Sequence, residues 1–128
     1  MKREVIKTDA APAAVGPYAQ ACRAQGSDTL YLSGQIPLDP ITGALVTESP
    51  TAQATQCMDN LAAVLSAAGL SFQNVVRCTI YLTDLDSFGE VNEVYGSYFA
   101  DPPPARACVE VSALPKGAQV EIDAIACS

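Results

Sequence analysis

The spacing of apolar side chains changes along the chain between the alternation typical of a β-strand and the three-to-four-residue repeat typical of a helix. The order of these segments limits the folds that the chain can adopt. Residues 75–83 alternate strictly between apolar and polar, which predicts a β-strand. Residues 51–69 and 87–100 instead repeat apolar side chains every three or four positions, which predicts two helices. Further strands are expected at residues 3–7, 18–25, 29–34, 105–113 and 118–126, with a turn at Gly26–Asp28.

Local signals refine these elements. The strand at 75–83 is expected to turn one apolar face inward, made of Val76, Cys78, Ile80 and Leu82. Gly69 is expected in the left-handed conformation after the first helix, and Ser87 with Glu90 predicts a capping box on the second. The segment Leu114–Gly117 matches a type I turn, which predicts that the last two strands form an antiparallel hairpin.

Two helices cannot cover both faces of a six-stranded sheet. We therefore expect an α+β fold in a single domain, residues 1–128, with both helices on one face of a mixed, mostly antiparallel sheet. The other face is left bare, and the mean hydropathy of +0.18 indicates surplus apolar surface. Both features predict a homo-oligomer.

Composition excludes several classes of function. The 128 residues contain no histidine, which removes the Ser-His-Asp triad, the Cys-His dyad and the usual histidine-rich zinc sites. A net charge of −7 disfavours nucleic-acid binding, because an acidic chain repels phosphate groups. The five cysteines lack the spacing of metal or redox motifs and are interpreted as free thiols. With no signal peptide or apolar span visible, the sequence predicts a cytoplasmic protein.

The last two predicted strands carry the most suggestive polar side chains. Under the hairpin model, Arg106, Cys108 and Glu121 project from the same side of the sheet. One interpretation is a solvated face with a surface ion pair. The other is an anion site, because the guanidinium fork binds both oxygens of a carboxylate at once. The residues alone leave both open.

Several ordered motifs resemble those of one family. They are Ala14-Val15-Gly16-Pro17-Tyr18, Ser33-Gly34-Gln35-Ile36-Pro37, Val91-Asn92-Glu93-Val94-Tyr95, residues 103–111, Leu114-Pro115-Lys116-Gly117 and residues 120–126. Together they run from near residue 5 to the C-terminus and resemble the RidA/YjgF family, also called the L-PSP endoribonuclease family. The family commonly has Phe at the position of Pro104, a departure expected to reshape the wall of the cleft.

The resemblance implies a chorismate-mutase-like fold and a homotrimer whose sheets form a barrel-like core, with clefts between subunits. It implies that Arg106 holds the carboxylate of the substrate and that Glu121 positions or activates water. Cys108 is expected to contact the ligand through its backbone. The remaining cleft positions are Tyr18, Ser33, Gly34 and Asn92.

The activity that this resemblance implies is hydrolysis of 2-aminoacrylate-type enamines and imines to 2-keto acids and ammonia, with no metal or organic cofactor. Positioning and modest general-base help suffice for such reactive substrates. Two alternatives stay open. One is an endoribonuclease or translation inhibitor, against which the acidic charge weighs. The other is a non-catalytic regulatory protein that binds 2-keto acids.

Overall fold

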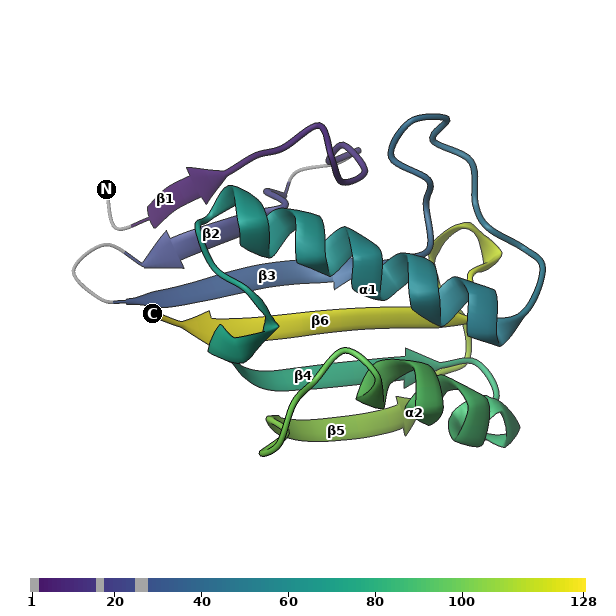
Figure 1. Cartoon of the computed structure of the whole chain (residues 1–128). Helices are drawn as coiled ribbons and strands as arrows, with labels where there is room; N and C mark the ends of the chain where they lie inside the picture. The colour runs from purple at the N-terminus through teal and green to yellow at the C-terminus, as the bar shows by residue number, and fades with distance from the viewer. Residues whose placement is uncertain (1–2, 16–17, 25–27) are drawn as a thin grey trace.

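The computed structural model describes residues 3–15, 18–24 and 28–128, and its centre is a six-stranded sheet of order β1-β2-β3-β6-β4-β5. The strands are β1 (Arg3–Ile6), β2 (Ala21–Ala24), β3 (Thr29–Gln35), β4 (Val75–Leu82), β5 (Ala105–Glu110) and β6 (Val120–Cys127). Both α-helices of the described residues, α1 (Pro50–Ala67) and α2 (Phe88–Gly96), cross the same face of this sheet (Figure 1). Among the strand pairs of the described residues, only β4–β5 is parallel, so the predicted mixed α+β sheet is confirmed. Gly26 and Ser27 of the predicted turn lie outside the described residues.

Helix α1 begins and ends where its sequence signals indicate. The Ser49 hydroxyl accepts a hydrogen bond from the Ala52 amide at 3.0 Å, and Pro50 occupies the first turn. Gly69 has a φ of 76°, as predicted for the residue after the helix. The apolar stripe of α1 is completely buried against the sheet: Ala54, Cys57, Met58, Leu61, Val64 and Leu65. Each large aliphatic side chain in this stripe contributes about 1.5–3 kcal/mol through burial.

Strands β4 and β6 supply the central floor of the core. Alternate residues of β6 are buried, namely Val120, Ile122, Ala124 and Ala126. In β4, Cys78, Ile80 and Leu82 are fully buried, but Val76 is 46% exposed. The predicted inward position of Val76 is wrong because the register of β4 against β6 shifts between Val75 and Arg77, so that Val75 is the buried residue.

The start of α2 differs from the prediction of a capping box. Ser87 makes no side-chain capping bond, because it ends a short 3-10 turn, Leu85–Ser87, and already has helical backbone angles. The side chain of Asp84 caps that turn instead by accepting a hydrogen bond from the Asp86 amide at 2.9 Å. The helix therefore covers Phe88–Gly96, which is shorter than the expected 87–100.

The predicted hairpin between the last two strands is wrong. Strand β6 lies between β3 and β4, whereas β5 pairs in parallel with β4 at one edge of the sheet (Figure 1). Parallel strands need a long crossover, and the segment that contains α2 provides it. The predicted type I turn is also wrong, since Lys116 and Gly117 both have positive φ angles, 58° and 75°.

Candidate functional site

Arg106 projects from β5 toward α2, where three side chains surround its guanidinium. Nη1 donates a hydrogen bond to Asn92 Oδ1 at 2.5 Å. The guanidinium carbon lies 5.5 Å from the ring centroid of Phe88 and 5.1 Å from that of Tyr95, both within cation–π range. In the described part of the chain the one ion pair joins Arg23 to Glu4, so no carboxylate neutralises Arg106. The arginine is exposed and has donors available for an anion.

Cys108 follows two residues later on the same face of β5. The Val111 amide donates to Leu82 O at 2.8 Å, so odd-numbered residues of this segment direct their backbone groups toward β4. The amide and carbonyl of Cys108 therefore point to the free edge of the sheet, where a ligand can reach them. Burial raises the pKa of the Cys108 thiol, and Arg106 lowers it less. The thiol is protonated at neutral pH, which agrees with the backbone role expected for this residue.

Glu121 lies in β6 directly against Gly34 of β3. A Cβ atom added to Gly34 would fall 2.2 Å from Glu121 Oε2 and 3.0 Å from Cδ, so the carboxyl group occupies the space that a side chain would need. The two residues line a hollow of about 350 Å³ together with Tyr18, Ser33 and Lys116. Four of the seven predicted site residues therefore gather in one concavity.

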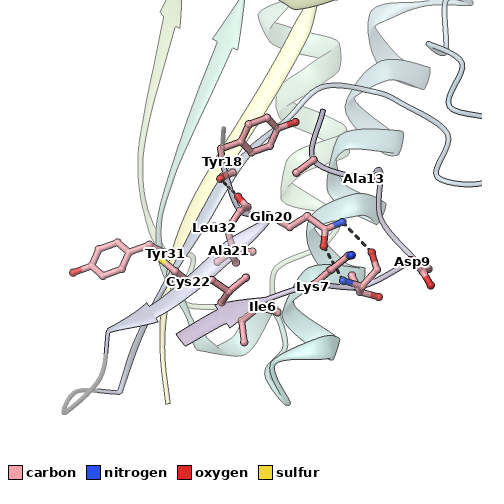
Figure 2. A pocket seen from close by; sticks show the side chains of 15 residues that line it. Ile6, Lys7, Asp9, Ala13, Tyr18, Gln20, Ala21, Cys22, Tyr31 and Leu32 are labelled. Atoms are coloured by element: carbon pink, nitrogen blue, oxygen red, sulfur yellow. Dashed lines mark hydrogen bonds between the residues drawn. The ribbon is translucent and has the colours of Figure 1, made fainter. Parts of the chain in front are cut away.

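The segment that carries Tyr18 is fastened to the sheet by polar contacts. Gln20, which is 4% exposed, donates from Nε2 to the carbonyls of Thr8, Ala11 and Pro12, and its Oε1 accepts from the Thr8 amide. Figure 2 draws the bonds between Gln20 and Thr8 as dashed lines. The Ser33 hydroxyl donates to Ala19 O at 2.6 Å. Its hydrogen is thus used to hold this segment, which leaves only its lone pairs for a ligand.

Tyr18 itself is 48% exposed and lies between the hollow beside Glu121 and a second one of about 860 Å³. Figure 2 shows this second hollow, with Tyr18 and Tyr31 extending away from the sheet at two of its sides. Tyr31 is 47% exposed although it is a large aromatic residue in a central strand. Uncovered aromatic surface of this kind is typical of a binding or subunit interface.

The carboxyl group of Glu121 is a poor acid in this setting. Half-burial raises its pKa above the ordinary value of 4.5, and the negative charge of Asp123 raises it further. Asp123 accepts hydrogen bonds from the Thr79 amide at 3.0 Å and from the Tyr81 hydroxyl at 3.1 Å. These bonds stabilise its charge and hold it close to Glu121. A carboxylate whose pKa is raised is a stronger base than an ordinary carboxylate.

The sheet separates the two halves of the predicted site. Cys78 of β4 is buried under the helices and is paired with Arg106 on one side and Ala124 on the other, so these three side chains share the helix-covered face. Tyr81 is paired with Glu121, and both lie on the opposite, helix-free face. The prediction that Arg106, Cys108 and Glu121 project from the same side is therefore wrong for Glu121. That prediction assumed that the last two strands form a hairpin. Because β5 pairs with β4 and not with β6, its alternate side chains are placed differently relative to those of β6.

Phe88 and Tyr95 are the site residues that sequence reasoning missed. Both belong to the apolar repeat that predicts the second helix, and Tyr95 is 4% exposed. With Asn92 they occupy positions i, i+4 and i+7 of α2, a spacing that brings side chains onto one face. The sequence signal that could have identified them is Asn92, a polar residue between two aromatic residues on one helix face. Such a residue indicates that a polar side chain contacts this face of the helix.

Other kinds of site find little support in the described residues. Across the ranges 3–15, 18–24 and 28–128, no three His, Cys, Asp or Glu side chains gather closely enough to hold a metal ion. Within the same ranges, neither helix has the length and apolar character needed to span a membrane.

Comparisons with known proteins agree on one family. Residues 8–128 match the family model described as Endoribonuclease L-PSP. Protein DfrA of Myxococcus xanthus is 59% identical over the whole chain and 98% of its own length. The mouse 2-iminobutanoate/2-iminopropanoate deaminase is 51% identical, with 97% of this chain and 90% of the mouse protein covered. The crystal structure of E. coli TdcF with bound serine superimposes with a TM-score of 0.90 at 40% identity, and 98% of each chain is covered.

Proposed function

The chain belongs to the endoribonuclease L-PSP family, also known as RidA/YjgF, and from that premise we propose that it hydrolyses small imines and enamines that carry a carboxylate. The observation that carries the proposal is the Arg106 guanidinium, held by Asn92 and lacking an acidic partner among the described residues. A relative named 2-iminobutanoate/2-iminopropanoate deaminase and a neighbour crystallised with serine both support a small carboxylate as ligand.

Arg106 and the free edge of β5 form the part of the proposed active site that holds the substrate. The donors of Arg106 not used by Asn92 bind the carboxylate of 2-iminopropanoate, the imine formed when 2-aminoacrylate tautomerises. The backbone of Cys108 at the free edge provides a further hydrogen bond. Holding the carboxylate fixes the C=N carbon beside it, which supplies orientation for attack.

Glu121 forms the part of the proposed active site that activates water. Its carboxylate accepts a proton as water adds to the C=N carbon, and the imine nitrogen gains a proton to give a carbinolamine. The carbinolamine then expels ammonia as its C–N bond breaks, its hydroxyl loses a proton, and a 2-keto acid remains. The raised pKa of Glu121 improves its strength as a base, and such assistance is worth about 10²–10⁴ in rate.

The two halves lie on opposite faces of one sheet, so we propose that a second copy of the chain completes each site. Arg106 with Cys108 from one copy would face Glu121, Gly34, Ser33 and Tyr18 from its neighbour. The exposed side chains of Tyr31, Val76 and Val109 support burial of the helix-free region between copies. A homotrimer of the kind implied by the family resemblance would satisfy this arrangement.

The test generates 2-aminoacrylate with a serine dehydratase and follows its decay with wild-type protein, Arg106→Ala, a control variant Arg23→Ala, and no protein. We expect wild type and Arg23→Ala to accelerate the decay, because an exposed ion pair such as that of Arg23 contributes little. Arg106→Ala should lose the acceleration. Equal decay in all four samples would reject the deaminase.

Mixing two inactive variants tests the shared site. Arg106→Ala and Glu121→Gln are unfolded and refolded together, so that copies assort at random. If each site takes one residue from each of two copies, about one quarter of wild-type activity returns. If both residues act within one copy, the mixture stays inactive.

The same preparations test the alternative functions. A protein that binds pyruvate through Arg106 but gives no turnover would be a regulatory binder of 2-keto acids. RNA cleavage, with an affinity that falls steeply with salt, would support the endoribonuclease. The net charge of −7 weighs against that second outcome.

A further inference from the structure

Arg106 is an exposed side chain whose guanidinium contacts three side chains of α2. A free arginine on a strand samples many rotamers, and binding an anion must then immobilise it at a cost in entropy. Here Phe88, Asn92 and Tyr95 surround the charged end before any ligand arrives. All three come from one face of α2, so the helix acts as a single preformed support.

The two aromatic rings are held in different ways. Phe88 is 37% exposed and is the first residue of α2. Tyr95 is 4% exposed and packs against Phe99, with ring centroids 4.8 Å apart. Tyr95 thus connects the guanidinium to the hydrophobic core, while Phe88 limits the outer side.

The hydroxyl group of Tyr95 does not explain why a tyrosine occupies this position. It is buried next to the Cys78 thiol and has no well-formed hydrogen bond within the part of the chain that the structure describes. A thiol is a weak hydrogen-bond partner, so this hydroxyl adds little to stability. What Tyr95 offers to Arg106 is the face of its ring, 5.1 Å from the guanidinium carbon.

We propose that Phe88 and Tyr95 are positioning residues, whose rings hold Arg106 in the orientation that binds the substrate carboxylate. This inference rests on the proposed function for its catalytic consequence. Asn92 fixes Nη1, and the two rings restrict the swing of the guanidinium about its long side chain. The donors that remain are presented in a constant direction, so less conformational freedom is lost when the carboxylate binds.

The experiment compares Phe88→Leu, Tyr95→Leu and Tyr95→Phe with a matched control, Phe99→Leu. Phe99 belongs to the same aromatic cluster and packs on Tyr95 and Phe72, and no ring contact joins it to Arg106. Pyruvate serves as a stable 2-keto acid, and its dissociation constant is measured by calorimetry. We expect Phe88→Leu and Tyr95→Leu to bind pyruvate about two- to fivefold more weakly, because binding must then immobilise an Arg106 side chain that the rings no longer hold.

Tyr95→Phe should retain wild-type affinity for pyruvate because it keeps the aromatic ring. Phe99→Leu should also retain it, because Phe99 makes no ring contact with Arg106. In the enamine assay, the two leucine variants should raise KM with little change in kcat. Phe88 is partly exposed, so its replacement tests the idea even if Tyr95→Leu fails to fold.

A second readout does not depend on turnover. The chain has four arginines, so the Nε–H signal of Arg106 can be assigned in a nitrogen-15 NMR spectrum by its loss in Arg106→Lys. Ring currents should displace this signal in wild type, Tyr95→Phe and Phe99→Leu, and the displacement should shrink in both leucine variants. An unchanged signal together with unchanged pyruvate affinity in Phe88→Leu and Tyr95→Leu would overturn the inference. Absence of turnover by wild type would reject the deaminase and leave this test intact.

Discussion

Gly34→Ala is a small change that should act almost entirely through Glu121. The new Cβ would lie 2.2 Å from Glu121 Oε2, whereas ordinary contacts begin at 3.4 Å, so the carboxyl group must retreat by about 1.2 Å. Gly34 does not have a positive φ, so alanine fits the backbone without strain. The clash falls on the far end of a flexible side chain, and the free energy of unfolding should therefore change by less than about 1 kcal/mol.

The effect on catalysis should be much larger. A misplacement of roughly 1 Å in a reacting group can cost about 10²-fold in rate, so kcat/KM for 2-aminoacrylate decay should fall by about two orders of magnitude. Pyruvate affinity should change little, because the carboxylate is held by Arg106. Thermal unfolding measured in parallel separates this loss from a folding defect.

A double-mutant cycle decides whether Glu121 carries the effect. If alanine acts by displacing Glu121, the pair Gly34→Ala with Glu121→Gln should be no worse than Glu121→Gln alone. Gly96→Ala is the control, because nothing lies within 4 Å of its added Cβ, and it should keep full activity. Undiminished activity in Gly34→Ala, or losses that multiply in the double variant, would refute the reasoning.

Three further outcomes concern stability. Leu61→Ala removes a completely buried side chain of α1 and should lower the free energy of unfolding by about 2–5 kcal/mol in urea denaturation; a loss below 1 kcal/mol would contradict the assigned core. Gln20→Ala leaves several buried backbone groups without partners and should cost about 1–3 kcal/mol, whereas an unchanged midpoint would show that the N-terminal segment is held otherwise. Because the pKa of Glu121 is raised on folding, its ionisation favours the unfolded chain; Glu121→Gln should therefore match wild type below pH 4.5 and become the more stable of the two as pH rises. The opposite trend in a pH series of melting curves would show that the carboxylate is stabilised by folding.

Local patterns in the sequence predicted most of the secondary structure. The stripe of α1 needed no tertiary information, because a period near 3.6 with Pro50 and Gly69 at its ends describes one helix wherever it packs. The alternation of β6 likewise identified its buried residues, since Val120, Ile122, Ala124 and Ala126 share one side of a strand in any sheet. The motif around Arg106 placed the arginine in a strand, which the structure confirms.

Boundaries and faces near the edge of the sheet were less predictable. An irregularity in the register of β4 leaves Val76 exposed and buries Val75. A bulge has this effect because it moves the residues before it to the opposite face of the strand. In β5, alanine and valine alternate with Arg106 and Cys108, so the strand has one apolar face. The apolar face of β5 is turned away from the helices, and Val109 is 41% exposed. Alternation shows that a strand has two faces, but it does not show which one the helices cover.

The sequence by itself determined which elements form and which side chains carry charge, because both depend on residues close together in the chain. Only the tertiary structure decided that β5 runs parallel to β4 and that β6 separates β4 from β3. Strand pairing is set by contacts between residues far apart in sequence and by the crossover through α2, so no local pattern records it. That pairing places Arg106 and Glu121 on opposite faces of one sheet, and it is the physical reason for proposing that two copies of the chain build each site.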